Sequence, residues 1–241
     1  MAKIFYLLVT VFILNSVSIG QTKFERDTFQ LSKGRLIITF IGHGTLMFDF
    51  NGKIIHIDPW SRLADYSKLP KADIVLITHH HQDHLDTIAI NNILKKNTKI
   101  VLTKDVFEII KTGIVMKNGD KQLVAGVNIE AVPAYNTTKG REIYHPKGRD
   151  NGYVLQIGEK RIYIAGDTEN IDEMAELKNI DIAFLPMNQP YTMLPEQVVD
   201  AVKKFKPKIL YPYHYGDTDV SKLKILLTNE KYVDVRIRTM K

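Results

Sequence analysis

The chain has 241 residues, of which 44% are hydrophobic and 25% charged, with 14 Gly, 9 Pro and no Cys. This composition is globular and excludes a collagen-like, low-complexity or wholly disordered chain, and the length suffices for one large core. Lys and Arg exceed Asp and Glu by 33 − 27 = 6, and they are scattered among acidic residues, so a nucleic-acid partner is not indicated. The lack of Cys excludes disulfides and thiolate ligands, so any metal site must consist of His, Asp and Glu.

The first twenty residues have the pattern of a secretory signal peptide. Lys3 supplies a positive charge, Ile4 to Leu14 is an almost unbroken apolar run, and residues 15–20 are mostly small or polar. We expect cleavage after Gly20 and an exported mature chain 21–241, periplasmic or secreted, that keeps no stable membrane anchor. An uncleaved anchor and a first buried strand are the alternatives for this segment.

Beyond residue 21 the pattern predicts a single domain with short strands, first in hairpins and later alternating with helices. The expected strands are Arg35 to Phe40, Thr45 to Phe50, Lys53 to Ile57, Ile74 to Thr78, Lys99 to Thr103, Val127 to Val132, Tyr153 to Ile157, Arg161 to Ala165, Ile182 to Pro186 and Lys208 to Tyr211. Helical patterns cover 86–95, 104–112, 171–177, 195–205 and 219–228. The last long helix places Leu194, Val198, Val202 and Phe205 on one apolar stripe. These elements predict mixed sheets whose outer faces are covered by helices.

The histidines carry the strongest functional signal. Four of the 8 lie in the six residues His-His-His-Gln-Asp-His that begin at His79, directly after the apolar run Ile74 to Ile77. Alternate side chains of an extended segment point the same way, so His79 and His81 can face one point. The turn that follows lets Asp83 and His84 face a neighbouring point. Imidazoles and carboxylates are ligands of Zn²⁺-like ions, and two ions can share a hydrolytic site. A solvent-exposed His-rich loop is the alternative.

This segment resembles the His-x-His-x-Asp-His signature of the metallo-β-lactamase superfamily. The further ligands that the resemblance requires follow in order, as His145 in Tyr-His-Pro-Lys-Gly, Asp167 in Ala-Gly-Asp-Thr and His214 in Tyr-Pro-Tyr-His-Tyr-Gly. Gly-His-Gly-Thr from Gly42 and Ile-Asp-Pro-Trp from Ile57 look like the N-terminal hairpins of the superfamily. The resemblance therefore covers residues from about 35 to about 217. It implies an α/β (α+β) fold, the four-layer αββα sandwich.

Within the superfamily the chain most resembles the branch compared with ascorbate-6-phosphate lactonase and N-acyl-phosphatidylethanolamine phospholipase D. The diagnostic runs are His-Pro-Lys-Gly at His145, Gly-Asp-Thr ending at Thr168 and Tyr-Thr-Met from Tyr191. The chain departs from the lactamases proper, because it has no Cys and because Tyr135 lies where their third histidine is expected. We take His145 as the third histidine, with a loop role for His145 and Tyr135 near the metals as the alternative.

The resemblance implies two divalent metal ions and a metal-bridging hydroxide that attacks the substrate. The implied ligands are His79, His81 and His145 for the first ion, Asp83, His84 and His214 for the second, and Asp167 as a bridge between them. Nitrogen and oxygen ligands favour Zn²⁺, with Mn²⁺ or Fe²⁺ as alternatives. Asp83 would also orient the nucleophile, and His43 is a candidate proton donor or a buried histidine bonded to the backbone.

Other polar residues near these motifs have two interpretations each. Asp58 could accept the second ring N–H of a ligand histidine or cap a turn before a proline. Lys147 and Arg149 could meet an anionic group of the substrate or solvate a loop. The tyrosines of the ligand-bearing loops could line a pocket or pack beneath them.

These observations predict a binuclear metal-dependent hydrolase that cleaves a phosphodiester, a lactone or a related ester in a small-molecule substrate. A β-lactamase-type amide hydrolase is the enzymatic alternative. A metal-binding module without catalysis on the same fold is the alternative of a different class. The sequence does not indicate the oligomeric state.

Overall fold

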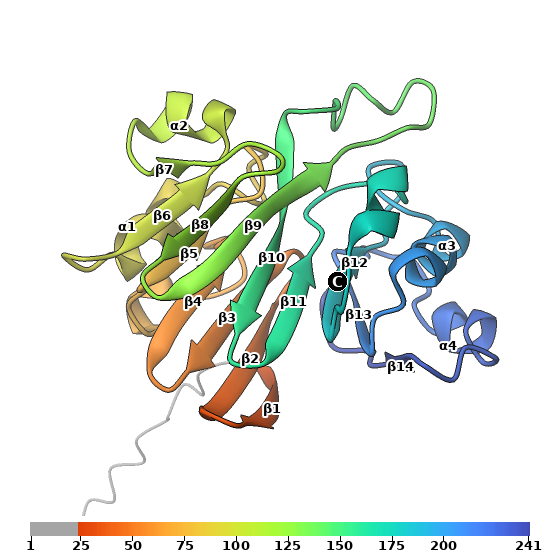
Figure 1. The fold of residues 1–241 in the computed structure, drawn as a ribbon. Helices are drawn as coiled ribbons and strands as arrows, with labels where there is room; N and C mark the ends of the chain where they lie inside the picture. Colours follow the sequence, from red (N-terminus) through yellow and green to blue (C-terminus); the bar gives the residue numbers. More distant parts are fainter. Residues whose placement is uncertain (1–23) are drawn as a thin grey trace, which may run out of the picture.

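The computed structural model of the chain describes residues 24–241, and the predicted signal peptide lies outside the described residues. Two seven-stranded sheets make up the centre of the molecule (Figure 1). The first sheet contains, in spatial order, β1 (Glu25–Leu31), β2 (Gly34–Gly42), β3 (Thr45–Phe50), β4 (Lys53–Ile57), β5 (Ile74–Leu76), β6 (Lys99–Leu102) and β7 (Ile114–Val115). The second contains β14 (Asp234–Val235), β13 (Ile209–Tyr213), β12 (Ile182–Pro186), β11 (Lys160–Ile164), β10 (Asp150–Ile157), β9 (Val127–Ala134) and β8 (Lys121–Val124).

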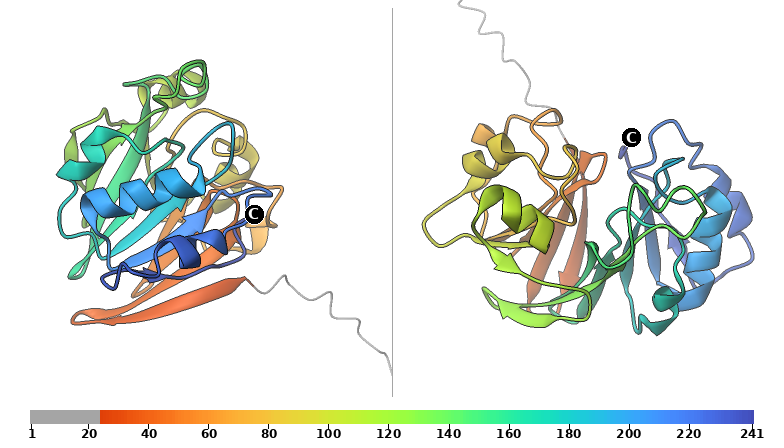
Figure 2. Two further views of the ribbon diagram at one scale, coloured as in Figure 1. Left: turned by 90° about the vertical axis from the view of Figure 1, so that its right-hand side faces the viewer. Right: turned by 90° about the horizontal axis from the view of Figure 1, so that it is seen from above.

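Helices cover the outer face of each sheet (Figure 2). The first sheet is covered by α1 (Thr87–Ile93), α2 (Lys104–Ile110) and the 3₁₀ helix η1 (Tyr66–Lys68). The second is covered by α3 (Pro195–Phe205), α4 (Lys222–Leu226) and the 3₁₀ helix η2 (Asp172–Glu176). The molecule thus has the predicted four layers, helix–sheet–sheet–helix.

Alternation along the strands explains why two apolar layers form on each sheet. In β5, Ile74 and Leu76 belong to the core between the two sheets. Val75 and Ile77 instead pack with the helices outside, in a cluster that contains Ile90 of α1. Because successive side chains of a strand point to opposite faces, an unbroken apolar run can serve both layers.

All ten predicted strands are present within a few residues of their predicted ends, whereas β1, β7, β8 and β14 were not predicted. The pattern at 171–177 forms the 3₁₀ helix η2, and the pattern at 219–228 is reduced to the short helix α4. The predicted apolar stripe of α3 is wrong at Leu194, which precedes the helix and is 42% exposed. None of the helices in residues 24–241 has the length and apolarity needed to cross a membrane.

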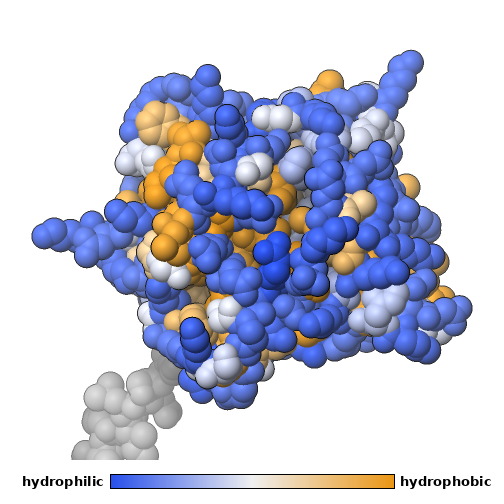
Figure 3. Space-filling model, viewed as in Figure 1, coloured by the Kyte–Doolittle hydropathy of each residue, from blue (hydrophilic) through white to orange (hydrophobic). Residues whose placement is uncertain are grey.

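The face of the molecule drawn in Figure 3 is mostly hydrophilic, and its apolar surface gathers near β7 and β8. Val115 and Leu123, which lie on these two short strands, are exposed.

The sequence pattern does not predict β1, because one of the inward positions of this strand is a charged residue. Asp27, Phe29 and Leu31 are the less exposed residues of this strand and alternate with exposed ones. The Asp27 carboxylate accepts hydrogen bonds from the guanidinium of Arg238 at 2.6 and 2.8 Å and from the Tyr211 hydroxyl. Burial alone would raise the pKa of Asp27, but these hydrogen bonds outweigh it and lower the pKa below its ordinary value. The edge strand is thereby tied to β13 and to the C-terminal segment.

We expect Asp27→Asn to lower the free energy of unfolding by about 1–3 kcal/mol at pH 7, because it removes the charge from a half-buried network. A carboxyl group with a lowered pKa stabilises the fold above the ordinary Asp pKa of about 4, and this contribution disappears as the pH falls below it. Urea unfolding measures the free energy of unfolding of the parent and of Asp27→Asn. The difference between the two proteins should be smaller at pH 3 than at pH 7. Arg26→Gln, on the exposed face of the same strand, is the control, and an equal loss in both variants would contradict the prediction.

Candidate metal centre

Loops from both sheets meet at one end of the interface between them. His43 follows β2 and residues 79–84 follow β5, whereas Asp167 follows β11 and His214 follows β13. Two backbone hydrogen bonds connect the sheets here. The N–H of His214 donates to the carbonyl of His43 (2.9 Å), and the N–H of Asn151, at the start of β10, donates to the carbonyl of Thr78 (3.1 Å). The fold therefore assembles residues that are far apart in the sequence.

Three imidazoles form the first group. The Nε2 atom of His79 lies 3.1 Å from Nδ1 of His81. The ring centroid of His145 lies 4.9 Å from the centroid of each of these two rings. Tyr135 has a different environment, since its hydroxyl donates to Glu173 at 2.8 Å. His145, rather than Tyr135, is therefore the residue of this loop that joins His79 and His81.

The second group contains His43, Asp83, His84 and His214, whose possible ligand atoms lie within 4.8 Å of one another. The Oδ2 atom of Asp83 lies 3.4 Å from Nε2 of His214 and 3.7 Å from Nε2 of His84. It also accepts a hydrogen bond from Nε2 of His43 at 2.9 Å. His43 thus bonds to a carboxylate and not, through this nitrogen, to the backbone.

Asp167 lies between the two groups. Its Oδ2 atom is 3.6 Å from Nε2 of His145 and 3.4 Å from Nε2 of His214. Its Oδ1 atom is 3.6 Å from Nε2 of His84. Two ligands that each bind a tetrahedral Zn²⁺ at about 2.0–2.1 Å stand about 3.4 Å apart. The spacing of these atoms therefore fits shared cations better than direct hydrogen bonds.

The inward-facing atoms of the cluster are also unpaired. Within residues 24–241, Nε2 of His84, Oδ1 of Asp167 and both ring nitrogens of His214 are buried and have no hydrogen-bond partner. Leaving a buried polar atom without a partner costs about 1–3 kcal/mol, more when it is charged. These atoms converge on one space, so the cluster is able to bind metal.

Hydrogen bonds from outside the cluster orient three of the imidazoles. His84 donates from Nδ1 to Asp58 (2.8 Å), and His145 donates from Nδ1 to Asp150 (3.0 Å). Nδ1 of His79 lies 2.9 Å from the Thr78 hydroxyl, which itself donates to Asp58. In each ring Nε2 is left facing the cluster, an arrangement that fixes the tautomer a metal ligand needs.

Among Asp58, Asp150 and Thr78, the sequence indicates only Asp58. Of its two interpretations, the geometry supports the hydrogen bond from a histidine. Asp150 and Thr78 were missed. The sequence feature that could have indicated Asp150 is its position, five residues after His145 and next to Arg149. Arg149 holds that carboxylate with hydrogen bonds from Nε (2.7 Å) and from its terminal nitrogen (2.9 Å).

The pKa directions reflect the crowding of these groups. Burial would raise the pKa of Asp83, but the His214 imidazole 3.4 Å away and the hydrogen bond from His43 outweigh it and hold that pKa far below its ordinary value. Burial would lower the pKa of His84, but the carboxylates around it, Asp167 first, raise that pKa to about 10. Burial and the neighbouring imidazoles lower the pKa of His79 well below its ordinary value and that of His81 to about 4. His79 and His81 therefore favour the neutral imidazole, which is the form that binds metal.

A glycine allows the loops to approach so closely. A Cβ atom on Gly44 would lie 2.8 Å from Cε1 of His84 and 3.4 Å from Cδ2 of His214. Any side chain at this position would displace an imidazole of the cluster.

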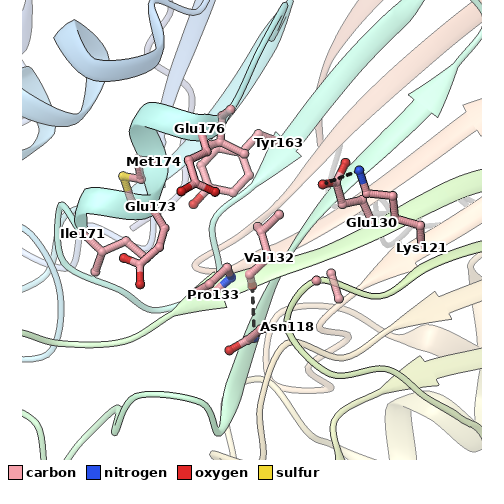
Figure 4. A pocket seen from close by; sticks show the side chains of 13 residues that line it. Asn118, Lys121, Glu130, Val132, Pro133, Tyr163, Ile171, Glu173, Met174 and Glu176 are labelled. Atoms are coloured by element: carbon pink, nitrogen blue, oxygen red, sulfur yellow. Dashed lines mark hydrogen bonds and ion pairs between the residues drawn. The ribbon is translucent and has the colours of Figure 1, made fainter.

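The hollow drawn in Figure 4 is separate from this cluster. It has a volume of about 430 Å³ and lies beside β9 and η2, where Val132, Tyr163 and Met174 line it. None of its lining residues belongs to the His/Asp cluster. The His/Asp cluster therefore remains the candidate site.

We expect Asp58→Asn to weaken metal binding about 10- to 100-fold, because it replaces the carboxylate that orients His84 while keeping a residue type that tolerates the positive φ of 43° at this position. Competition against a chromophoric chelator measures the change. Asp65→Asn, an exposed carboxylate seven residues further on, should bind metal as the parent does. Equal affinity of the parent and Asp58→Asn would show that the negative charge of Asp58 is irrelevant to binding.

Comparison with known proteins agrees with this geometry. The model of the Beta-lactamase superfamily domain matches residues 37–214. A UPF0173 metal-dependent hydrolase of Nanoarchaeum equitans is 32% identical over 197 residues, which are 77% of this chain and 86% of that protein. The structure of a proposed metal-dependent hydrolase from Parabacteroides distasonis is 52% identical with a TM-score of 0.89, and the match covers 91% of this chain and all of the other.

The fold extends to more distant proteins. Igni18, a metallo hydrolase from Ignicoccus hospitalis, is 27% identical with a TM-score of 0.72, and the match covers 86% of this chain and 96% of the other. The predicted superfamily is confirmed, whereas the likeness to the lactonase and phospholipase D branch stays a prediction. The chain belongs to the metallo-β-lactamase superfamily and, within it, to the UPF0173 metal-dependent hydrolases.

Proposed function

We propose that this hydrolase uses two divalent metal ions to cleave a phosphodiester, a lactone or a related ester in a small molecule. The observation that carries the proposal is the position of the Asp167 carboxylate, whose two oxygens lie 3.4–3.6 Å from imidazole nitrogens of both groups. A carboxylate can bridge two cations with its two oxygens and offset part of their charge. No other carboxylate among residues 24–241 joins both groups.

The proposed first metal site consists of His79, His81 and His145, and the second of Asp83, His84 and His214. Asp167 completes both. Nitrogen and oxygen donors in this number suit Zn²⁺, and Fe²⁺ and Mn²⁺ accept the same donors. Within residues 24–241, Nε2 of His84, Oδ1 of Asp167 and the ring nitrogens of His214 have no hydrogen-bond partner, which supports cations rather than a closed polar network.

Bound divalent cations would lower the pKa of a water molecule at the centre toward 7 and polarise an oxygen of the substrate. The chain's own contribution is positioning. Asp83 is 32% exposed whereas Asp167 is 4% exposed, so the substrate approaches from the side of Asp83. His43 bonds to Asp83 at 2.9 Å and is 15% exposed, which places its ring where it can pass a proton between that carboxylate and a leaving group.

We expect the purified chain to bind about two equivalents of metal, because two groups of ligands are present. His145→Ala and Asp167→Ala should each reduce this to about one equivalent or less. His80→Ala is the matched control, since His80 lies in the same loop but in neither group. Elemental analysis after metal loading and gel filtration gives the stoichiometry. A parent chain that binds one equivalent, or variants that still bind two, would contradict the binuclear assignment.

We also expect metal-dependent turnover of a 4-nitrophenyl phosphodiester, a lactone or an ester, and a fall of at least 100-fold in kcat/KM for Asp83→Asn and Asp167→Asn. The panel should include a β-lactam, since turnover of that substrate alone would favour the amide hydrolase. Two bound equivalents without turnover of any panel member would favour a binding module. Chelation and metal restoration serve as the control that the activity belongs to the metal-loaded protein.

A further inference from the structure

Two loops meet beside the candidate metal centre, one at residues 135–149, which carries His145, and one at residues 187–194. The buried side chain of Asn136 joins them, because its Nδ2 atom donates to the carbonyls of Arg141 (3.2 Å) and Tyr191 (2.8 Å). The rings of Tyr144 and Tyr191 are in edge contact, with centroids 4.9 Å apart. The two loops therefore form one continuous wall.

This wall borders the cluster at both ends. Tyr144 directly precedes His145 in the chain. At the other end, the N–H of Met187 lies 3.4 Å from the carbonyl of His214, with which it forms a hydrogen bond. The second loop therefore extends from a residue of the second group to the loop that carries a residue of the first.

The wall exposes apolar side chains. Of the nine large apolar side chains that are exposed in residues 24–241, three lie on these loops, namely Ile143 (75%), Tyr191 (43%) and Leu194 (42%). Apolar side chains scattered singly on a surface need no explanation, but a group beside a reactive centre is typical of ligand binding. We call Ile143, Tyr144, Tyr191 and Leu194 the aromatic rim.

Three of the four cations of the same loop form ion pairs within residues 24–241, and the exposed Lys139 is the exception. Arg141 lies 3.6 Å from Glu169, Lys147 lies 2.8 Å from Glu173, and Arg149 lies 2.7 Å from Asp150. These pairs neutralise the charges that the sequence suggested for an anionic group of the substrate. Beside His145, where Lys147 and Arg149 are paired, the surface offered to a ligand is therefore ring and aliphatic.

We propose that the aromatic rim binds an uncharged, apolar or aromatic group of the substrate next to the bond that is cleaved. The proposal rests on the proposed function, because it takes the His/Asp cluster as the metal centre that holds the reacting group. Tyrosine rings suit this purpose, since they bury a large area and lose little conformational entropy when they do so.

The test compares phenylphosphonate with methylphosphonate, which share one anionic head group for the metals and differ only in the apolar substituent. Isothermal titration of the zinc-loaded protein gives both dissociation constants without any need for turnover. We expect phenylphosphonate to bind about 3- to 10-fold more tightly, as partial burial of a ring predicts. Tyr191→Ser should reduce this preference to less than about 2-fold, and Tyr191→Phe should keep it.

The Tyr191→Ser variant keeps the backbone carbonyl to which Asn136 donates, so the tie between the loops remains. Leu123→Ser is the matched control, because it removes a side chain that is 70% exposed on β8, outside the rim. Equal affinity of the parent for the two phosphonates, or a preference that survives Tyr191→Ser, would overturn the inference alone. Failure of both phosphonates to bind the zinc-loaded protein would instead count against the proposed function.

Discussion

The burial of negative charge between the two sheets is the constraint on which the rest of the site depends. Asp58, Asp83 and Asp167 lie together, and no Lys or Arg in residues 24–241 forms an ion pair with any of them. A buried carboxylate without a positive partner is strongly unfavourable, so the charge must be balanced by imidazolium or by metal ions. The histidines around these carboxylates can be protonated to imidazolium, or they can bind metal ions together with them. This requirement is consistent with glycine at position 44, because a side chain there would occupy the space of the His84 ring beside the carboxylates.

The sequence predicts most of the fold because its strands are apolar on both faces and its turns are marked by residues such as Asn51 and Gly52. It misses β1 because the inward position of Asp27 is charged, and its partner Arg238 is 211 residues away. The cluster at residues 79–84 is predictable for a local reason, since alternation and one turn place its side chains. The role of Asp150 depends on how the loop after His145 returns to the sheet, which no local pattern reveals.

The same limit applies to charges near the centre. In the sequence, Lys147 and Arg149 are basic residues beside a presumed ligand, and an anionic substrate is a natural partner for them. In the folded chain, Glu173 from η2 reaches Lys147 and the neighbouring Asp150 takes up Arg149. The charges of Lys147 and Arg149 are therefore already paired, one by a residue far away in the sequence and the other by its neighbour.

Hydrogen bonds within the protein hold the backbone at the site. His43, Asp58 and His214 adopt φ values of 50°, 43° and 46°, in the left-handed region that costs about 1–3 kcal/mol for a residue other than glycine. Asp and His tolerate this conformation better than most residues. Hydrogen bonds within the fold compensate the cost, including that from His214 to the carbonyl of His43 and those from Thr78 to Asp58. These bonds join groups of the protein itself, so the fold contributes to the positions of His43, Asp58 and His214.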